Sequence, residues 1–282
     1  MKTVSVCGVP EHFNMPWHLA MAEGAFEKRG IVLEWISVPE GTGRMSQMLA
    51  KNETDLAIIL TEGIVKSISE GNPAKIVQTY VDSPLLWGIH VAANSSFTTI
   101  PDLIGKKAAI SRLGSGSHLM AFVHARQQGW DIHKLRFEVV HTLEGAVESL
   151  KQGRADYFMW EHFTTKPLVD NGTFRWLGDC PTPWPCFVIA ASGHFLEKDN
   201  AIVQHILETI NLFTREFKYI PSIDSALANR YGQQLEDIRL WLTKTQWGQQ
   251  QLDPKTLSTV IDTLSTLQLL GKMNDPRGFI TS

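Results

Sequence analysis

The stretch Ser111–His118, which reads SRLGSGSH, separates a short strand-like segment from a helical pattern. Lys106–Ile110 before it is β-prone at its end, and Leu119 and Phe122 after it fall on one face of a helix. The pattern predicts a strand, a tight Gly/Ser turn and a helix. Such a turn directs free backbone N–H groups and the positive end of a helix dipole at one point, where the Ser hydroxyls and Arg112 add donors.

Two interpretations of this turn stay open. It could hold a carboxylate, sulfonate or phosphate, or it could be an ordinary helix cap, because Ser and Gly are preferred there in any case. It is not a dinucleotide fingerprint, since Gly114-Ser115-Gly116 lacks the third glycine that close helix packing needs. A Walker-type Gly-Lys-Ser/Thr motif and the Gly-x-Ser-x-Gly elbow of hydrolases are also absent from the sequence.

The composition fits a globular protein of one large domain or two lobes. The chain has 282 residues, 43% hydrophobic and 20% charged, with a formal net charge of −3. That charge, and the lack of any Lys/Arg-rich tract, argues against nucleic-acid binding. Apolar runs such as Leu56–Leu60 are far too short to cross a membrane. Three cysteines, an odd number, make a disulfide framework improbable, so we expect three free thiols.

Strand and helix signals alternate from the first residues. Val4–Val9 is strand-like, Trp17–Lys28 is helical and Ile31–Val38 is again a strand. Asp55–Leu60 is short and almost wholly apolar, as the strands of a parallel sheet are. The part from 200 to 270 is mostly helical. This βαβ alternation predicts parallel sheets covered on both faces by helices.

An internal echo predicts two similar lobes. Leu49–Leu56 aligns without gaps on Leu150–Tyr157, and each segment joins an amphipathic helix to an apolar strand. Two segments with Pro and Trp ahead of an apolar strand, Val81–Val91 and Thr182–Ile189, are candidates for the crossings between lobes. We therefore expect a discontinuous first lobe of residues 1–88 and 190–282 and a second lobe of residues 89–189.

The order of these elements resembles a known family. The segments Gly24–Ile31 and Asp102–Lys107, together with Gly114–Ser117, are similar to the type II periplasmic-binding-protein fold. The resemblance covers about residues 1 to 230. The chain most resembles the branch with the alkanesulfonate, taurine and nitrate binding proteins and the thiamine-pyrimidine-synthase-like (NMT1/THI5-like) proteins. Within the fold, a leaderless cytosolic side branch is the nearest group. The cysteine-rich motif of the yeast-type pyrimidine synthases is missing from this chain.

The resemblance implies an α/β fold of two lobes, each a mainly parallel sheet flanked by helices, with a ligand cleft between them. Ligands of open α/β sheets bind outside the carboxyl ends of the strands. The residues expected to face the ligand lie in the loops at those ends: His12, Asn14, Trp17, Gly41, Thr42, Thr61, Glu62, Ser83, Trp87, Ser111, Arg112, Gly114, Ser115, Gly116, Ser117, Trp160, Glu161 and Trp184.

The residue types in these loops indicate the chemistry of the ligand. Four Trp residues in the set favour an organic ligand with a flat or apolar part, although a Trp is more often a core residue. Glu62 and Glu161 could accept hydrogen bonds from a ligand amine or ring N–H, or could be ordinary first-turn helix residues. No histidine or cysteine spacing is typical of a metal site, and we expect neither a metal nor a cofactor.

We expect a binding protein that closes two lobes over a polar or anionic ligand, such as a sulfonate, a carboxylate or a pyrimidine-like compound. The rival is an enzyme of pyrimidine, thiamine or other cofactor biosynthesis on the same fold, with His12, His118 or Glu161 as the acid–base group. The start of the sequence resembles a first strand and not a signal peptide, which predicts a cytoplasmic protein. If a leader has been removed, a periplasmic location and a transporter permease as partner are expected instead.

Overall fold

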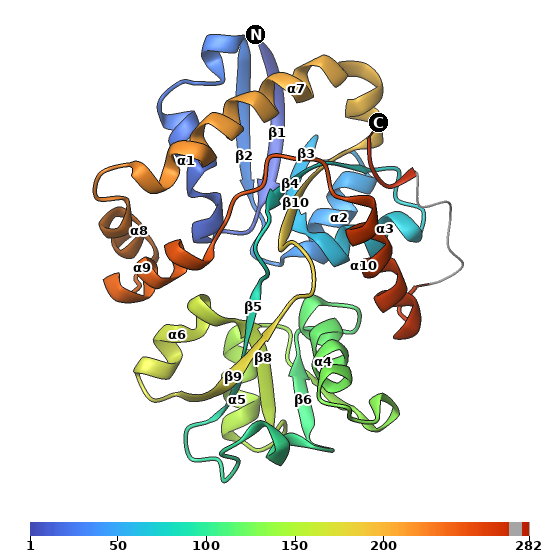
Figure 1. Cartoon of the computed structure of the whole chain (residues 1–282), viewed down its shortest axis with the longest axis vertical. Helices are drawn as coiled ribbons and strands as arrows, with labels where there is room; N and C mark the ends of the chain where they lie inside the picture. Colours follow the sequence, from blue (N-terminus) through green and yellow to red (C-terminus); the bar gives the residue numbers. More distant parts are fainter. Residues whose placement is uncertain (271–277, 282) are drawn as a thin grey trace. The chain divides into compact units, whose positions relative to one another are not determined.

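A computed structural model describes residues 1–270 and 278–281. The chain divides into two compact units, each with its own five-stranded sheet (Figure 1). Unit 1 consists of Met1–Ser83 and Trp184–Ser282, and unit 2 consists of Pro84–Pro183. The expected boundaries, 88/89 and 189/190, need correction. The crossings come earlier because the strand after the first crossing belongs wholly to the sheet of unit 2, and the strand after the second belongs wholly to that of unit 1.

The sheet of unit 1 has the strand order β2-β1-β3-β10-β4. Its strands are β1 (Lys2–Gly8), β2 (Ile31–Ser37), β3 (Leu56–Leu60), β4 (Lys75–Val81) and β10 (Phe187–Ala191). β1, β2 and β3 are parallel, and β10 is antiparallel to both β3 and β4. The apolar run that forms β3 is buried at the centre of the sheet, as the sequence predicts for a parallel strand.

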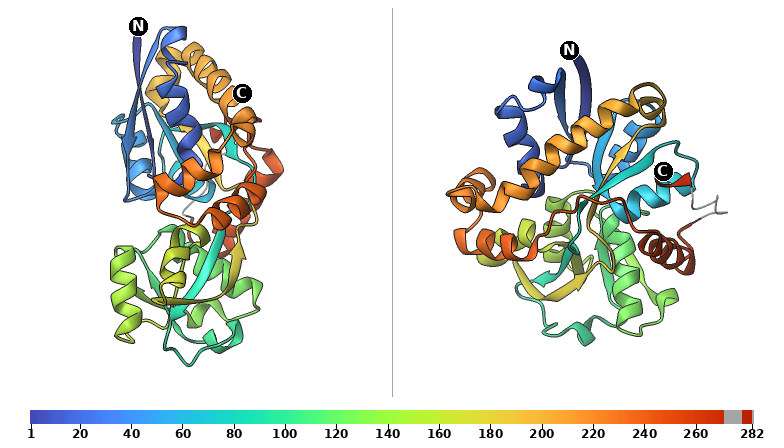
Figure 2. Two further views of the ribbon diagram at one scale, coloured as in Figure 1. Left: turned by 90° about the vertical axis from the view of Figure 1, so that its left-hand side faces the viewer. Right: turned by 45° about the horizontal axis from the view of Figure 1, so that its top comes forward.

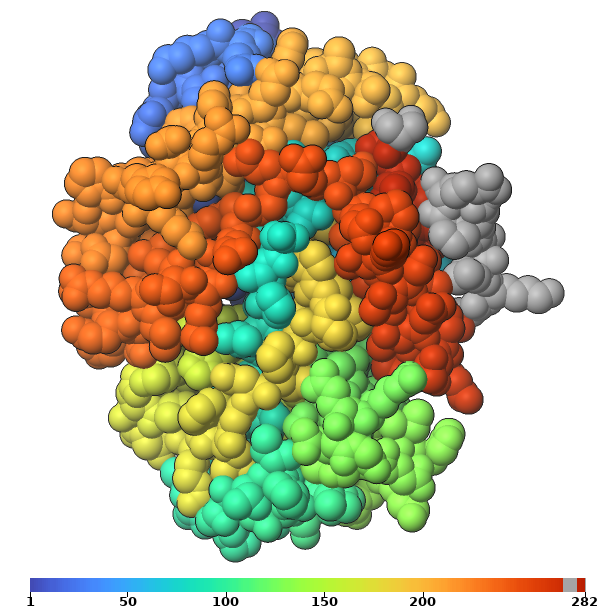
Figure 3. Space-filling model, viewed as in Figure 1, coloured from blue at the N-terminus to red at the C-terminus, as the bar shows by residue number. Residues whose placement is uncertain are grey.

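The helices of unit 1 come from both ends of the chain. The first part contributes η1 (His12–Asn14), α1 (Met15–Ala22), η2 (Glu27–Arg29), α2 (Thr42–Ala50) and α3 (Thr61–Ser69). The second part contributes α7 (Gly193–Glu216), η5 (Phe217–Tyr219), α8 (Ile223–Tyr231), α9 (Leu235–Lys244) and α10 (Pro254–Thr266). α1 packs against α7, as Figures 1 and 2 show, and α2 packs against α3. α8 and α9 lie side by side on the surface of this unit (orange in Figure 3).

The helix expected over Trp17–Lys28 is shorter than the sequence suggests. α1 ends at Ala22, and Gly24 follows with a φ of 64°, in the left-handed region that favours glycine. The chain then makes the short 3₁₀ helix η2 before β2. A glycine in the middle of an apolar helical pattern thus stops the helix here.

The outer edge of β4 is covered by two described stretches near the C-terminus, around residues 247–250 and 279–280. The N–H groups of Ile76 and Thr79 donate to the carbonyls of Phe279 and Gln250, both at 2.8 Å, and Gly248 N–H donates to the Tyr80 carbonyl at 3.0 Å. An exposed strand edge would offer a template for pairing with other chains. These two stretches therefore complete the sheet in place of a further strand.

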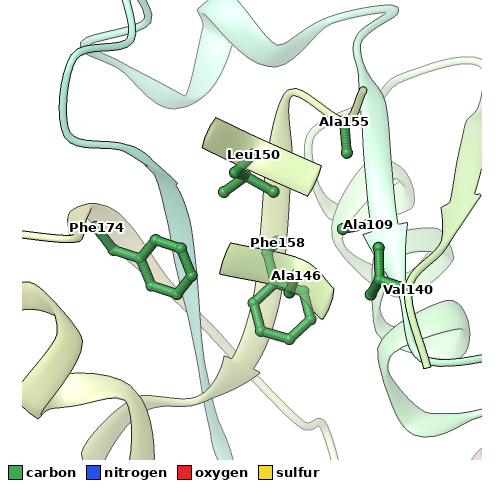
Figure 4. Packing of buried hydrophobic residues seen from close by; sticks show 7 residues of the cluster. All are labelled: Ala109, Val140, Ala146, Leu150, Ala155, Phe158 and Phe174. Atoms are coloured by element: carbon green, nitrogen blue, oxygen red, sulfur yellow. The ribbon is translucent and has the colours of Figure 1, made fainter. Parts of the chain in front are cut away.

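The sheet of unit 2 has the order β7-β6-β8-β5-β9. Its elements are β5 (Leu86–Ala92), η3 (Ile100–Leu103), β6 (Lys107–Ile110), α4 (Gly116–Gln127), η4 (Ile132–Lys134), β7 (Arg136–Val139), α5 (Leu143–Lys151), β8 (Tyr157–Glu161), α6 (His162–Asp170) and β9 (Phe174–Pro181). β6, β7 and β8 are parallel, and β5 runs antiparallel to its two neighbours. On one face of the sheet, Ala146 and Leu150 of α5 pack against Phe158 of β8 (Figure 4).

The internal echo corresponds to the same local structure in both units. Asn52 and Gly153, which the alignment pairs, have φ values of 56° and 67°, and each follows the helix before the central strand. The chain therefore makes the same left-handed turn in both units, at the residue four positions before the start of β3 and of β8. The next aligned pair of acids also has one role, because Asp55 Oδ2 accepts from Ser5 N–H at 2.8 Å and Asp156 Oδ2 accepts from Lys107 N–H at 2.7 Å. Each Asp fixes the helix-to-strand turn to the neighbouring parallel strand.

Candidate functional site

The carboxyl ends of the parallel strands in unit 1 bring several predicted residues to one edge of the sheet. β1 leads to η1 and α1, β2 leads to α2, and β3 leads directly to α3. β10 runs the other way, so its beginning lies at the same edge, with Phe187 paired to Leu60 at the end of β3. Trp184, three residues before β10, is thereby placed next to the start of α3.

The helices that begin at this edge have no side-chain caps. The N-cap residues of α1, α2 and α3 are Asn14, Gly41 and Leu60, and none of them makes a capping hydrogen bond through a side chain. Gly41 has a φ of 76°, which a residue with a side chain would adopt only under strain. Side chains therefore leave these helix starts uncapped, although the N–H groups of Met15 and Thr61 already donate to the backbone carbonyls of His12 and Cys186.

The first turns of α2 and α3 are in close contact. A Cβ atom on Gly63 would lie 2.1 Å from Cγ2 of Thr42, so only glycine allows this approach. Thr61 is buried, and its hydroxyl donates to the Pro185 carbonyl while its N–H donates to the Cys186 carbonyl at 3.2 Å. The start of α3 is thus fixed on one side by α2 and on the other by the segment that carries Trp184.

Glu62, in the first turn of α3, is a buried carboxyl in unit 1. It is 2% exposed, and its Oε2 accepts a hydrogen bond from Trp184 Nε1 at 2.8 Å. Its other oxygen, Oε1, is buried and has no hydrogen-bond partner among the described residues. Burial raises the pKa of Glu62 to about 7, because desolvation of the carboxylate outweighs the indole hydrogen bond.

The segment after β1 is held inside unit 1. The Asn14 side chain donates from Nδ2 to the Val9 carbonyl at 2.9 Å, while its Oδ1 is buried and unpartnered within the described part of the chain. His12 is 1% exposed and packs against Trp241 and Tyr231, with ring centroids 4.4 and 5.9 Å away. Burial lowers the pKa of His12 to about 3, so this imidazole is neutral at pH 7.

Two further predicted residues of unit 1 have structural contacts. Trp17 is 0% exposed, and its ring lies among Phe26, Trp35 and Tyr80 at centroid distances of 6.0–6.3 Å. Ser83 accepts a hydrogen bond from Gln246 N–H at 3.0 Å through its hydroxyl. A ligand contact for either residue stays a prediction.

In unit 2, the Gly/Ser turn after β6 is a network of hydroxyl groups. Ser117 Oγ accepts from Ser111 N–H at 3.0 Å and lies 3.1 Å from Ser115 Oγ. Ser115 caps α4, because its Oγ accepts from His118 N–H at 3.3 Å. His118 Nδ1 in turn accepts from Gly114 N–H at 3.0 Å. The strand, turn and helix have the predicted order, and the turn's own side chains use several of its donors.

The remaining members of the turn lie nearer the surface. Arg112 is half-buried, Gly114 is exposed with a φ of 77°, and Gly116 begins α4.

All three helices that follow the parallel strands of this unit have side-chain caps, from Ser115, Thr142 and Glu161. In this respect unit 2 is the opposite of unit 1.

Replacing Ser115 by Ala should therefore act mainly on stability. Loss of the N-cap should lower the free energy of unfolding by about 0.5–2 kcal/mol. Chemical denaturation followed by circular dichroism measures the change. Ser258→Ala, on the exposed face of α10, is the control and should leave stability within about 0.5 kcal/mol of the parent. An unchanged Ser115→Ala variant would show that the cap contributes nothing.

Glu161 resembles Glu62 in position but not in bonding. It ends β8 and is 5% exposed, and its Oε2 accepts from both the N–H and the hydroxyl of Thr164, at 2.6 and 2.8 Å. Burial raises the pKa of this carboxyl as well. Trp87 pairs with it across β5 and β8, and the Trp87 ring meets that of Trp160 edge to face at 6.4 Å.

The structure also shows contacts of polar and aromatic groups outside the set of residues expected to contact the ligand. His162 Nδ1 lies 2.8 Å from Asp179 Oδ1, which also accepts from Trp176 Nε1 at 3.0 Å. The Trp241 ring packs edge to face against His12, although 228 residues lie between them in the chain. A Trp on a helical face looks like any core residue, so the sequence carries no signal for this contact. His162 directly follows Glu161, and its place in the chain already puts it in the same expected ligand-facing loop.

Neither a metal cluster nor a membrane helix is present in the described part of the chain. No group of three or more His, Cys, Asp or Glu side chains in residues 1–270 and 278–281 is arranged to hold a metal ion. Over the same residues, every helix is too short or too polar to cross a bilayer.

Comparison with known proteins identifies the fold. Residues 87–180, within unit 2, match a family model described as Ca3427-like PBP. The Candida albicans CA3427 gene product, described as defining a new family with the generic periplasmic-binding-protein fold, is 28% identical, with a TM-score of 0.90 over 100% of this chain and 96% of its own. This chain has the type II periplasmic-binding-protein fold. The fold expected from the sequence is confirmed.

Two sulfonate-binding proteins share this type II fold at lower identity. The periplasmic aliphatic sulphonate binding protein SsuA from Escherichia coli is 20% identical, with a TM-score of 0.77 over 100% of this chain and 92% of its own. The alkanesulfonate-binding protein SsuA from Xanthomonas axonopodis pv. citri, bound to MOPS, is 17% identical, with a TM-score of 0.81 over 96% of this chain and 95% of its own. No curated protein sequence matches the chain.

Proposed function

We propose that this chain is a small-molecule binding protein whose ligand is a polar or anionic organic compound held by the loops that follow the parallel strands. The observation that carries the proposal is the set of unused polar groups at the strand ends of unit 1. Three helices begin there without side-chain caps, and Asn14 Oδ1 and Glu62 Oε1 are buried without partners among the described residues. Such groups are costly to leave unpaired, and a bound ligand would pair them.

The relatives support a small ligand of this general kind. The two sulfonate-binding proteins are described by the ligand class that they bind, and one of them holds a buffer molecule with a sulfonate group. Sulfonates, carboxylates and pyrimidine-like compounds are the classes that we propose to test first. Each has a flat or compact polar end, and the helix N-termini could bind its acceptor atoms.

In this proposal the two units close over the ligand, as the two-lobed fold allows. Small-angle X-ray scattering with and without a saturating ligand tests the closure, and an unchanged radius of gyration would contradict it.

If the protein acts outside the cytoplasm, an ABC transporter permease would be its partner. If it acts inside, it would serve as a carrier or sensor of its ligand.

A thermal-shift screen of metabolites tests the function directly. A ligand at about 100 times its Kd should add roughly 2.7 kcal/mol to the free energy of unfolding. Sulfonates, carboxylates and nitrogen heterocycles form the first panel, each measured against a buffer-matched blank. A panel of several hundred compounds in which none raises the melting temperature would contradict the proposal.

The alternative is an enzyme of cofactor biosynthesis on the same fold. The acid–base candidates of this alternative are engaged in the structure: His12 is enclosed by aromatic rings, His118 Nδ1 accepts from Gly114, and Glu161 caps α6. These contacts favour binding over catalysis.

We also propose that the protein is cytoplasmic and keeps its thiols reduced. Cys7, Cys180 and Cys186 are buried and form no disulfide with one another, and burial raises the pKa of Cys7 and of Cys180 to about 12. A thiol reagent should therefore react slowly with the native protein and with all three cysteines after denaturation without reductant. One reactive thiol in place of three would indicate a Cys180–Cys186 disulfide and an oxidising compartment.

A further inference from the structure

Glu62 differs from every other buried carboxyl that the structure describes near a strand end. Glu161, the other predicted carboxyl near a strand end, has an oxygen that accepts two hydrogen bonds from Thr164 and caps a helix. Glu62 does not cap α3, because the N-cap position belongs to Leu60. Its carboxyl forms no ion pair within the described residues, and its hydrogen bonds come from the backbone of Glu62 itself and from Trp184 Nε1.

The buried, unpartnered Oε1 of Glu62 is energetically unfavourable. The Glu62 carboxylate is 2% exposed, and the free energy that it loses on desolvation exceeds what its hydrogen bonds to its own backbone and to the Trp184 indole return. The raised pKa of Glu62 expresses this imbalance. A donor that reached Oε1 would restore the missing hydrogen bond, and a charge-assisted bond of this kind is about twice as strong as a neutral one.

The surroundings allow acceptors as well as donors on the ligand. The beginnings of α2 and α3 lie in contact through Thr42 and Gly63, and neither helix has a side-chain cap. Arg44, the one arginine in the first turn of α2, forms an ion pair with Glu53 at 2.6 Å. The starts of α2 and α3 thus offer backbone N–H donors and the carboxyl of Glu62 as an acceptor, while the Arg44 guanidinium is paired with Glu53.

We propose that Glu62, oriented by Trp184, is a specificity residue that selects ligands with an N–H donor or a protonated nitrogen, such as amidines, aromatic amines and ring N–H groups, over sulfonates and carboxylates. This inference rests on the proposed binding function and narrows it. An anion placed at Oε1 would face a carboxyl oxygen, and like charges or unpaired lone pairs at that distance oppose binding. An N–H group there would complete the bonding of the carboxylate.

Four benzene derivatives of similar size test the selection: benzamidine, benzamide, benzoate and benzenesulfonate. Isothermal titration of the full chain should give the order benzamidine first, benzamide second and the two anions last. Glu62→Gln keeps the shape of the side chain and should weaken benzamidine binding about ten- to a hundredfold. Trp184→Phe keeps an aromatic ring but removes the donor that orients Glu62, and should weaken it in the same direction.

A matched control separates Glu62 from a general loss of charge. Glu70→Gln, at the other end of α3, removes an exposed carboxyl that pairs with Lys66, and benzamidine affinity should stay within about twofold of the parent. Denaturation curves of all variants establish that each is folded. Since a neutral Gln needs less desolvation than a carboxylate, Glu62→Gln should be at least as stable as the parent.

Three results would overturn the inference. They are tighter binding of benzenesulfonate than of benzamidine, no benzamidine binding at all, or equal benzamidine binding by the parent and Glu62→Gln. The proposed function is tested separately by the metabolite screen. An anionic metabolite that binds tightly while benzamidine does not would leave the binding function standing and remove the role of Glu62 in selecting an N–H donor.

Discussion

Trp17→Ala should lower the free energy of unfolding by about 3–5 kcal/mol, the range for a large aromatic residue removed from a packed core. The Trp17 ring is fully buried between Phe26, Trp35 and Tyr80, and these neighbours belong to three different parts of unit 1. Its removal leaves a cavity that the strands and α1 cannot fill without moving. Urea denaturation followed by far-UV circular dichroism measures the loss.

The control for this variant is an aromatic residue at the surface. Tyr219 is 80% exposed, and Tyr219→Ala should change stability by no more than about 0.5 kcal/mol. A loss below about 1 kcal/mol for Trp17→Ala would contradict a core role. If such a variant also failed to bind a ligand from the screen, Trp17 would be a ligand contact, as the loop position first suggested.

Gly145→Ala should destabilise unit 2 by about 1–3 kcal/mol or more, because overpacking against a fixed backbone is costly. A Cβ atom at Gly145 would lie 2.0 Å from the carbonyl oxygen of Val140. That oxygen belongs to the turn after β7, where the Thr142 side chain caps α5. The first turn of α5 would have to move away from the sheet that it covers.

The neighbouring residue supplies the comparison for Gly145→Ala. Glu144 is exposed in the same helical turn, and Glu144→Ala should stay within about 0.5 kcal/mol of the parent. Thermal melts of both variants, recorded side by side, separate a steric effect from a change of helix propensity. A more stable Gly145→Ala variant would mean that the turn relaxes freely, since alanine otherwise favours a helix over glycine.

The architecture could be predicted from the sequence because its signals are local. Short apolar strands such as Leu56–Leu60, the alternation with helical patterns and the repeated turn at Asn52 and Gly153 all depend on residues close together in the chain. The expected lobe boundaries, 88/89 and 189/190, lie a few residues after those of the structure, although both expected crossing segments contain the observed crossings. Pro and Trp mark both of them, but the start of a strand is a weak signal at either one.

The candidate site was less accessible to sequence reasoning. Glu161 is the last residue of β8 and Glu62 the second residue after β3, and only the structure shows that Glu161 caps a helix and Glu62 does not. The sequence does contain one local signal of this difference. Thr164, three residues after Glu161, has a hydroxyl that donates to it, whereas Val65, three residues after Glu62, has no polar side chain. The contact between Glu62 and Trp184 spans 122 positions and depends on the antiparallel course of β10. No periodicity could have revealed it.

Native mass spectrometry of the full chain, incubated with a metabolite extract and then desalted, tests the central claim most directly. The account predicts one small molecule bound per chain, released unchanged on denaturation, with the same mass before and after prolonged incubation. A chain that retains no compound, or that converts the bound compound into one of different mass, would contradict it.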